Sequence, residues 1–345
     1  MTYISSWRSP SNIALVKYWG KHGVQLPRNP SLSFTLSACH TDMKITVTSE
    51  TSKPELVVLY DGKERPSFES KIESFFNLLQ DYTPWISKAS VFIDSVNTFP
   101  HGAGIASSAS AMSALALCLA DIDDQINARS ESHSELWWRH VSQIARLGSG
   151  SACRSLFPVA ALWGAIKVIG ESSDSFAIPW ADHLSPVYHS YQDTILLVST
   201  EEKRISSSAG HEMMNSLAYA NVRYGVAEKN LIHLLQSMQT EDKIDVFMSV
   251  CESEALQLHA LMMSGDRPFV LMEPNTLAII KEVWRFRKES GVPVCFTLDA
   301  GPNVHLLYPA AYKGTVLDWV NNILTPFCSE GHYILDEAGG GPAKL

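Results

Sequence analysis

A glycine- and serine-rich loop that runs directly into an alanine-rich helix restricts most strongly how this chain can fold. Residues 97–115 read NTFPHGAGIASSASAMSAL, and the small residues Gly102, Ala103 and Gly104 precede a helix expected over 106–119. Small residues leave backbone N–H groups uncovered, and the helix N-terminus adds free donors and the positive end of its dipole. The loop therefore predicts a phosphate-binding site.

The loop matches neither of the two common phosphate motifs. No Lys follows the glycines, as a Walker A sequence requires, and the third glycine of a dinucleotide fingerprint is missing. A glycine turn followed by a serine cap on an ordinary core helix explains the same letters. The choice between the two interpretations depends on the rest of the chain.

Length and composition indicate a globular protein. With 345 residues the chain exceeds one average domain, and 46% hydrophobic with 18% charged residues is ordinary for a packed core. The formal net charge of −9 disfavours nucleic acid and anionic membranes as partners. We see no signal peptide and no membrane span, and the six scattered cysteines favour free thiols in the reducing cytoplasm.

Strand and helix signals alternate along the first half of the chain. Alternating apolar residues predict strands at 31–38, 43–49, 55–60 and 90–96, with a hairpin turn at Asp61-Gly62. Helical spacing predicts helices at 66–80, 106–119 and 135–146. The apolar run 159–169 suggests paired strands, and the polar, proline-containing segment 180–191 is the best candidate for a domain connection.

The second half shows the same alternation with longer helices. Strands are expected at 194–200, 294–297 and 304–308, and helices at 212–239 with a break, 243–262 and 274–290. This pattern suits a small open sheet covered by helices.

A lysine near the N-terminus is a candidate for a buried charge. Lys17 and Lys21 flank the aromatic pair Tyr18-Trp19. If 13–19 is a strand, alternation sends Lys17 inward wherever its face is covered. A buried lysine needs a charged partner or an anionic ligand, whereas a snorkelling surface lysine is the competing interpretation.

Two further segments place a charged side chain beside glycines. In GSGSACRS, at 148–155, Arg154 offers a planar fork suited to carboxylate or phosphate, although a helix cap with a structural salt bridge explains it as well. In FTLDAGPNVHLL, at 296–307, Asp299 ends a strand and enters a turn where it can meet a ligand hydroxyl. The alternative is an Asx turn that binds only local N–H groups.

Other polar groups give weaker signals. The twelve histidines show no metal-ligand spacing, so we predict no site held by protein ligands alone. The acidic cluster Asp121, Asp123 and Asp124 follows a predicted helix and is interpreted as solvated.

Four motifs together resemble one family. NIALVKYWGK, FPHGAGIASSAS, ARLGSGSACRS and FTLDAGPNV occur in the order and approximate separation seen in diphosphomevalonate decarboxylases of the GHMP kinase superfamily, from Asn12 to Asn303. The resemblance implies an α/β (α+β) fold with a nucleotide-binding domain at 1–187, a ferredoxin-like domain at 188–345 and an active site in the cleft between them. It also implies ATP- and Mg²⁺-dependent conversion of mevalonate 5-diphosphate to isopentenyl diphosphate through phosphorylation of the 3-hydroxyl.

The resemblance assigns roles residue by residue. Asp299 matches the catalytic acid at the 3-hydroxyl, Lys17 the lysine that neutralises the transferring phosphoryl group, and Arg154 the arginine that grips the substrate carboxylate. The ATP phosphate loop corresponds to Pro100, His101, Gly102, Ala103, Gly104, Ser107, Ser108 and Ser110, with Ser107 and Ser108 also nearest Mg²⁺. Substrate contacts correspond to Asn12, Tyr18, Lys21, Ser149, Gly150, Ser151, Arg154 and Ser207.

The sequence departs from the family pattern at two places and leaves rival functions open. His101 and Gly102 stand where the family has Thr and Ala, which affects nucleotide affinity, and the segment 156–164 lacks the usual Gly-Gly and acidic residue. A mevalonate 3-kinase and a phosphomevalonate decarboxylase are alternatives within the superfamily, and a catalytically silent metabolite-binding protein is the alternative of another class. A cytoplasmic homodimer is the usual expectation for such enzymes.

Overall fold

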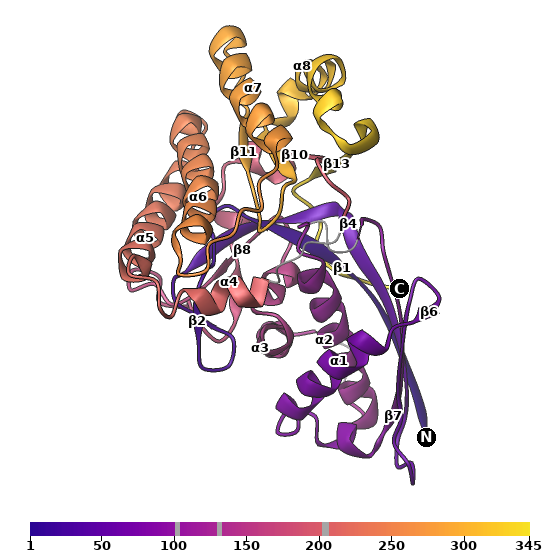
Figure 1. Cartoon of the computed structure of the whole chain (residues 1–345). Helices are drawn as coiled ribbons and strands as arrows, with labels where there is room; N and C mark the ends of the chain where they lie inside the picture. The colour runs from indigo at the N-terminus through magenta and orange to yellow at the C-terminus, as the bar shows by residue number, and fades with distance from the viewer. Residues whose placement is uncertain (101–103, 130–132, 202–206) are drawn as a thin grey trace.

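Eight strands form the larger of two main sheets in the computed structural model, which describes residues 1–100, 104–129, 133–201 and 207–345 (Figure 1). Its main path runs β14 (Ala343–Lys344), β1 (Thr2–Ala14), β4 (Ser31–Thr48), β7 (Ser90–Asn97), β5 (Leu56–Tyr60) and β6 (Lys63–Glu64). β8 (Ala160–Trp163) pairs with β4 and with β9 (Ala177–Pro179), while β2 (Lys21–His22) and β3 (Leu26–Pro27) pair separately.

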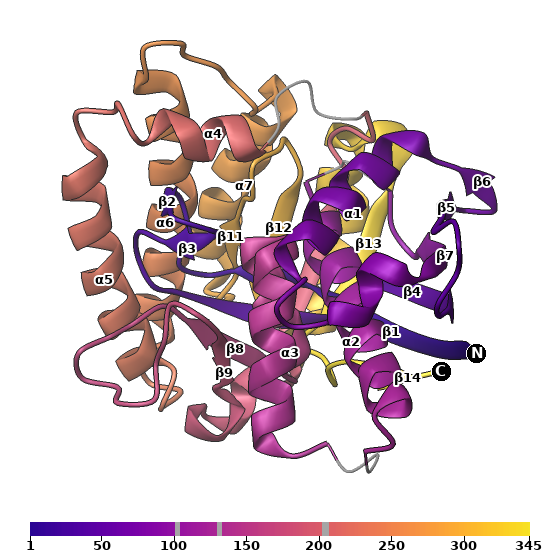
Figure 2. The same ribbon diagram turned by 90° about the horizontal axis from the view of Figure 1, so that it is seen from below.

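Three helices cover one face of this sheet, as Figures 1 and 2 show: α1 (Pro66–Leu78), α2 (Ser107–Ile126) and α3 (Glu135–Gly148). The central strands alternate, so Ile45, Val47 and Ile93 point into a core that also contains Leu115 and Leu119 of α2. Because α2 is buried along most of its length, its N-terminus is held rigidly at the loop that precedes it.

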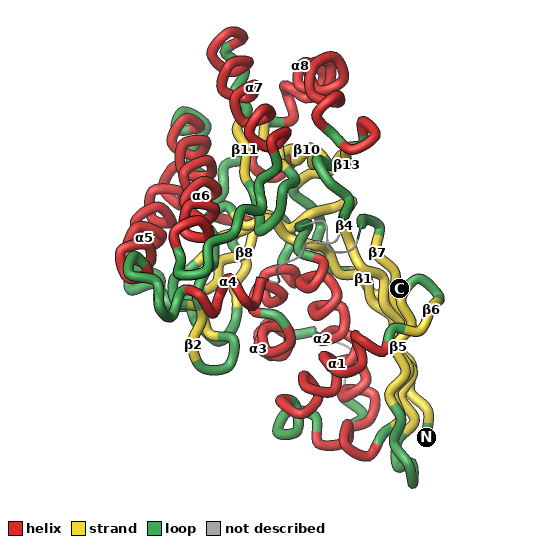
Figure 3. Tube along the Cα trace, in the orientation of Figure 1, coloured by secondary structure: helices red, strands yellow, loops and turns green. Residues whose placement is uncertain are grey.

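The second half contains a four-stranded antiparallel sheet with the order β11-β12-β10-β13. Its strands are β10 (Gln192–Leu196), β11 (Cys295–Thr297), β12 (Val304–Tyr308) and β13 (Tyr333–Glu337). Between β10 and β11 lie α4 (Ser207–Met213), α5 (Ala220–Ser237), α6 (Ile244–Ser264) and α7 (Pro274–Ser290), and between β12 and β13 lies α8 (Lys313–Trp319) (Figure 3). This order of elements and strands is the ferredoxin-like arrangement that the resemblance implied.

Short helical segments join the main elements. They are Pro84–Lys88, Gly150–Leu156, Ala181–His183, Pro186–Ser190, Ala310–Tyr312, Thr325–Phe327 and Ser329–Gly331, all of the 3₁₀ type, and the π-helix Val320–Leu324. The predicted connection 180–191 is built of two of these segments, and the predicted domain boundary at 187 falls inside the second. Each helix in the described part of the chain is too short or too polar to cross a membrane.

Several sequence expectations were wrong in detail. The strands expected at 31–38 and 43–49 are one continuous strand, β4, and only residues 160–163 of the run 159–169 form a strand, paired with β9. Strand β1 ends at Ala14, so the segment containing Lys17 is not a strand.

The acidic cluster is buried rather than solvated. Asp121, Asp123 and Asp124 lie inside α2, where their carboxylates accept hydrogen bonds from Ser5, Trp85 and Trp137, among others. These bonds replace the water that the carboxylates would otherwise need.

One carboxylate ties the second half of the chain to the long strand of the first. The pairing of β1 with β4 shifts register between Pro10 and Asn12, which frees backbone N–H groups of β4. Asp336 of β13 accepts hydrogen bonds from the N–H groups of Ser37, Ala38 and Cys39 at 2.7 to 2.8 Å. The buried carboxylate of Asp336 therefore accepts hydrogen bonds from the backbone N–H groups of β4 that the irregular pairing leaves without a strand partner.

Asp336→Asn is expected to lower the free energy of unfolding by about 2 to 3 kcal/mol, because an amide group supplies only one acceptor oxygen for these backbone donors. Urea unfolding followed by fluorescence measures the change, with Glu289→Gln at an exposed position of α7 as the matched control. Equal unfolding midpoints for the two variants would contradict the assigned role of Asp336.

Candidate active site

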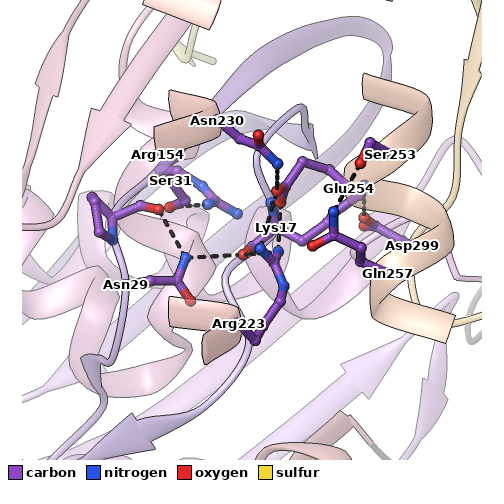
Figure 4. A network of polar contacts seen from close by, with 11 residues as sticks. Lys17, Asn29, Ser31, Arg154, Arg223, Asn230, Ser253, Glu254, Gln257 and Asp299 are labelled. Atoms are coloured by element: carbon purple, nitrogen blue, oxygen red, sulfur yellow. Dashed lines mark hydrogen bonds and ion pairs between the residues drawn. The ribbon is translucent and has the colours of Figure 1, made fainter. Parts of the chain in front are cut away.

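A buried ion pair joins the first and second halves of the chain. Lys17 follows β1 with its side chain only 2% exposed, and its Nζ lies 2.8 Å from Oδ1 of Asp299 (Figure 4). Asp299 follows β11 at the start of the glycine turn, and its side chain is 22% exposed. Burial opposes ionisation of Asp299, but the charge and hydrogen bond of Lys17 outweigh it and hold the pKa of the carboxyl below its ordinary value.

The main chain of Lys17 is held as firmly as its side chain. Its N–H donates to Oε2 of Glu254 on α6 at 2.9 Å, and its carbonyl accepts from Nδ2 of Asn29 at 3.1 Å (Figure 4). Glu254 is fully buried and also accepts from Arg223 and Asn230 of α5. The lysine is therefore fixed from the side of the C-terminal helices.

Arg154 lies in the same region with unused hydrogen-bonding capacity. Its guanidinium is buried, Nη1 donates to Ser31 Oγ at 2.5 Å, and Nε has no partner among the described residues. Its positive charge also helps to lower the pKa of Asp299. A buried arginine with free N–H donors is suited to bind a carboxylate or a phosphate.

The glycine-rich loop reaches the turn that carries Asp299. Gly104 has φ = +82°, and a Cβ placed on it would lie 3.4 Å from Cα of Gly301. Ala106 then adopts a left-handed conformation and α2 begins at Ser107. The free N–H groups at the start of this 20-residue helix thus follow closely after Gly104, which approaches the turn of Asp299.

The serines of the loop divide into exposed and buried groups. Ser108 is exposed, with its Oγ 3.4 Å from Oγ of Ser149, and Ser107 is partly exposed. Ser110 is fully buried and accepts a hydrogen bond from Thr41, so its hydroxyl belongs to the protein interior. Pro100 lies next to His101, Gly102 and Ala103, which lie outside the described residues.

The start of α2 offers donors that are compatible with nucleotide phosphates and a magnesium ion. No group of three or more His, Cys, Asp or Glu side chains in the described part of the chain could hold a metal ion. Magnesium commonly keeps several waters and takes substrate phosphates as ligands, so two serine hydroxyls at a helix start are a compatible donor set. Ser107 and Ser108 stand in that position.

Tyr18 lies beside Gly150, another predicted substrate residue, and between two further rings. Its ring lies 4.7 Å from the ring of Trp163 and 4.5 Å from that of His211, and its buried hydroxyl has no hydrogen-bond partner in the described structure. A Cβ on Gly150 would lie 2.8 Å from that hydroxyl oxygen, so any larger residue here would displace the Tyr18 side chain. Burial raises the pKa of Tyr18, which therefore stays a neutral donor.

A cavity of about 670 Å³ continues from this point. Basic side chains line it, namely Lys21, His22, Arg28 and His211. Lys21 donates to Gln25 at 2.9 Å, and burial lowers its pKa. Lys21 and Arg28 thus offer two positive charges to a polyanion, in a cavity that the acidic Glu212 also lines.

The remaining predicted substrate residues lie at different places. Asn12 is buried and donates to Ser155 and to the carbonyl of Ser151, while its Oδ1 has no partner among the described residues. Ser149 and Ser151 are partly exposed beside Gly150. Ser207 opens α4, and its side chain lies outside the described structure.

Sequence reasoning missed the residues that support the ion pair. Glu254 and His259 of α6, Arg223 of α5 and Asn29 carry no local motif. The only signal was a carboxylate and an imidazole among the many apolar residues of α6, where buried polar groups need partners, but other polar residues of this helix give the same signal.

Known proteins match this chain over nearly its whole length. The family model "Diphosphomevalonate decarboxylase-like N-terminal domain" matches residues 9–177, and "Mevalonate 5-diphosphate decarboxylase C-terminal domain" matches residues 194–338. The diphosphomevalonate decarboxylase of Saccharomyces cerevisiae is 30% identical over 92% of this chain and 81% of its own. That of Rattus norvegicus is 30% identical over 86% and 74%, respectively.

Solved structures agree in fold. A structure described as "MDDEF in complex with MVAPP, AMPPCP and Magnesium" superposes with a TM-score of 0.83 at 28% identity, over 100% of this chain and 99% of that chain. The mevalonate diphosphate decarboxylase of Staphylococcus aureus gives a TM-score of 0.83 at 26% identity, over 100% and 98%. The chain belongs to the diphosphomevalonate decarboxylase family.

Proposed function

We propose that this protein catalyses the ATP-dependent decarboxylation of mevalonate 5-diphosphate to isopentenyl diphosphate, with release of ADP, phosphate and CO₂. One observation supports this most directly: Gly104 of the glycine-rich loop lies close to Gly301 in the turn of Asp299, whose carboxylate is paired with the buried Lys17. A phosphate donor site thus lies beside an ionised acid that can orient a hydroxyl. Membership of the family indicates the substrate class. It also indicates ATP as the nucleotide and Mg²⁺ as the metal ion.

The phosphoryl-transfer step requires alignment rather than a strong base. A tertiary alcohol has a pKa far above that of a carboxyl group, so Asp299 accepts a hydrogen bond from the 3-hydroxyl and takes its proton only as the new O–P bond forms. Lys17 offsets negative charge at the transferring group, and the N–H groups at the start of α2 hold the phosphates. Ser107 and Ser108 would hold Mg²⁺, which would supply further charge neutralisation at the phosphates.

The decarboxylation step requires an oriented carboxylate. When the 3-phosphate leaves with its electron pair, positive character develops at C3. The electrons of the bond to the carboxylate carbon then form the new double bond, and CO₂ is released. Arg154 is buried with an unpartnered N–H donor among the described residues, and it orients the carboxylate. Asn12 donates a hydrogen bond to Ser155, the residue after Arg154, and so lies close enough to assist.

The remaining substrate contacts fit a diphosphate tail. Lys21 lines the basic cavity with Arg28 and His211, next to Tyr18 and Gly150. We place the 5-diphosphate there, with Ser149, Ser151 and Ser207 as further donors. Arg28 is an addition to the residues that the sequence singled out.

The cellular compartment and the oligomeric state of the protein are also proposed here. All six cysteines are buried and free, which supports the reducing cytoplasm as its compartment. We also predict a homodimer, because dimers are the commonest assembly of such enzymes. Light scattering of the purified protein tests this prediction.

Incubation with ATP, Mg²⁺ and mevalonate 5-diphosphate is expected to release ADP, phosphate and CO₂ in equal amounts. Release of ADP without CO₂ would favour a 3-kinase instead. Turnover with the 5-monophosphate in preference to the diphosphate would indicate a phosphomevalonate decarboxylase, and no ADP at all would favour a binding protein.

Asp299→Asn is expected to lower kcat by about a thousandfold, because an amide neither carries the charge that pairs with Lys17 nor accepts the proton. The affinity for ATP, measured by calorimetry, should stay within about twofold. Asp318→Asn, at an exposed position of α8, is the control. A rate near that of the unmodified protein would remove Asp299 from the mechanism.

Gly150→Ala is expected to raise KM for mevalonate 5-diphosphate by about tenfold, because the added methyl group displaces the hydroxyl of Tyr18. KM for ATP should change little. Gly170→Ala provides the control, since a Cβ there meets no atom within 4 Å. An equal change in both KM values would argue against a substrate-specific role for this contact.

A further inference from the structure

We propose that α6 is the positioning element of the Lys17–Asp299 pair, in which Glu254 holds the main chain of Lys17 and His259 holds the main chain of Asp299. This inference rests on the proposed function, since it concerns the pair assigned there to phosphoryl transfer. Glu254 and His259 touch neither substrate nor nucleotide in this scheme. They are positioning residues, and they act through the two charged side chains.

On the lysine side, one buried carboxylate fixes a segment that has no regular structure. Residues 17–20 follow the end of β1 and belong to no strand or helix. The N–H of Lys17 donates to Glu254 Oε2 at 2.9 Å, and Arg223 Nη2 lies 3.5 Å from the carbonyl oxygen of the same lysine. The peptide groups on both sides of this Cα therefore face the same ion pair of the C-terminal helices (Figure 4).

Neighbouring side chains of α5 compensate the negative charge of Glu254. Arg223 donates to both of its carboxylate oxygens, at 3.0 and 2.5 Å, and Asn230 donates to Oε1 at 2.7 Å. Glu254 and Arg223 are 0% and 3% exposed. Because the two charges compensate each other, Glu254 can accept the lysine N–H without competing with Asp299 for the ammonium group.

On the aspartate side, a neutral histidine holds the turn. His259 is 1% exposed, and its Nε2 lies 3.1 Å from the carbonyl oxygen of Asp299. Burial lowers the pKa of His259 to about 4, so the ring is neutral at physiological pH and donates from Nε2. The same carbonyl accepts from the N–H of Gly301 at 2.8 Å, which completes its hydrogen bonding.

Both anchors therefore lie on one rigid element. Glu254 and His259 are five residues apart within the 21-residue helix α6, which packs against β11 and α5. Lys17 and Asp299 are separated by 282 residues along the chain, so no local structure relates them. A helix that grips both main chains can set the distance between Nζ and Oδ1 at low entropic cost.

A matched control exists on the same helix. Glu252 is a second buried carboxylate of α6, paired with Arg287 at 2.5 Å and with the indole of Trp284 at 2.8 Å. Those partners lie on α7, and Glu252 forms no described hydrogen bond with Lys17 or Asp299. Glu252→Gln therefore removes a comparable buried charge without touching the anchors.

The experiment compares Glu254→Gln, His259→Leu, His259→Gln and Glu252→Gln in the full-length protein. The first two are expected to lower kcat by about a hundredfold, as misplacement by about 1 Å can do, with both KM values within about twofold. His259→Gln retains a neutral donor and is expected to stay within about fivefold of the unmodified rate. Glu252→Gln should lower the melting temperature while kcat is retained.

A second measurement is independent of turnover. The pKa of Asp299 is followed by carbon NMR of labelled aspartate carboxyl groups without substrate, with Asp299→Asn for assignment. It should rise in Glu254→Gln and His259→Leu, because Lys17 no longer approaches closely, and stay constant in Glu252→Gln. If Glu254→Gln does not fold, Glu254→Asp keeps the charge opposite Arg223 and withdraws the acceptor from Lys17.

The two proposals fail in distinguishable ways. An unmodified protein without ADP or CO₂ release overturns the proposed function, while the NMR titration still decides the role of α6. Equal kcat values and equal Asp299 pKa values in the Glu254, His259 and Glu252 variants would overturn the positioning role.

Discussion

The buried ammonium group of Lys17 is the constraint on which the rest of the site depends. A charge that is 2% exposed is costly unless an opposite charge meets it at hydrogen-bond distance. Only Asp299, from the far end of the chain, does so among the described residues. The ammonium group of Lys17 therefore gains its counter-charge only when the two halves of the protein have folded against each other. The ion pair forms only in the correctly assembled fold.

Other polar contacts make this meeting of the two halves specific. Asp336 binds N–H groups released by the irregular stretch of β4, and Glu254 binds the N–H of Lys17. In both cases a carboxylate of the second half satisfies main-chain donors of the first. Apolar packing alone would tolerate small shifts, whereas a charged acceptor with several donors permits one arrangement.

The sequence singled out the parts of the candidate site whose proposed chemistry demands unusual residues. The loop near Gly104, the turn at Asp299 and the arginine segment at 154 were visible because glycines and charges side by side are rare in ordinary packing. Strand alternation left two interpretations of Lys17 open, a buried charge and a surface lysine. Lys17 is buried, but its segment lies beyond β1 and contacts α6. These segments come together through contacts between residues far apart in the sequence, and a local sequence pattern does not show such contacts.

The errors have the same origin. Strand β1 went undetected for most of its length because TYISSWRSPSN is polar and contains a proline, and it is stabilised mainly by pairing with β4. Glu254 and His259 were unnoticed because α6 carries several other polar residues, such as Glu252 and Gln257, and no local pattern distinguishes the two anchors from them. Likewise, the carboxylates of α2 looked solvated, because the tryptophan indoles that bind them come from other segments.

The close approach of Gly104 to Gly301 makes one glycine important to two segments. A Cβ on Gly104 would lie 3.4 Å from Cα of Gly301, at van der Waals distance, and the φ of +82° is one that residues with side chains rarely adopt. A side chain longer than a methyl group at this position would meet the backbone of the turn that carries Asp299. A substitution of Gly104 would therefore strain the loop and disturb the turn at the same time, so this residue couples the conformation of the loop to the position of Asp299.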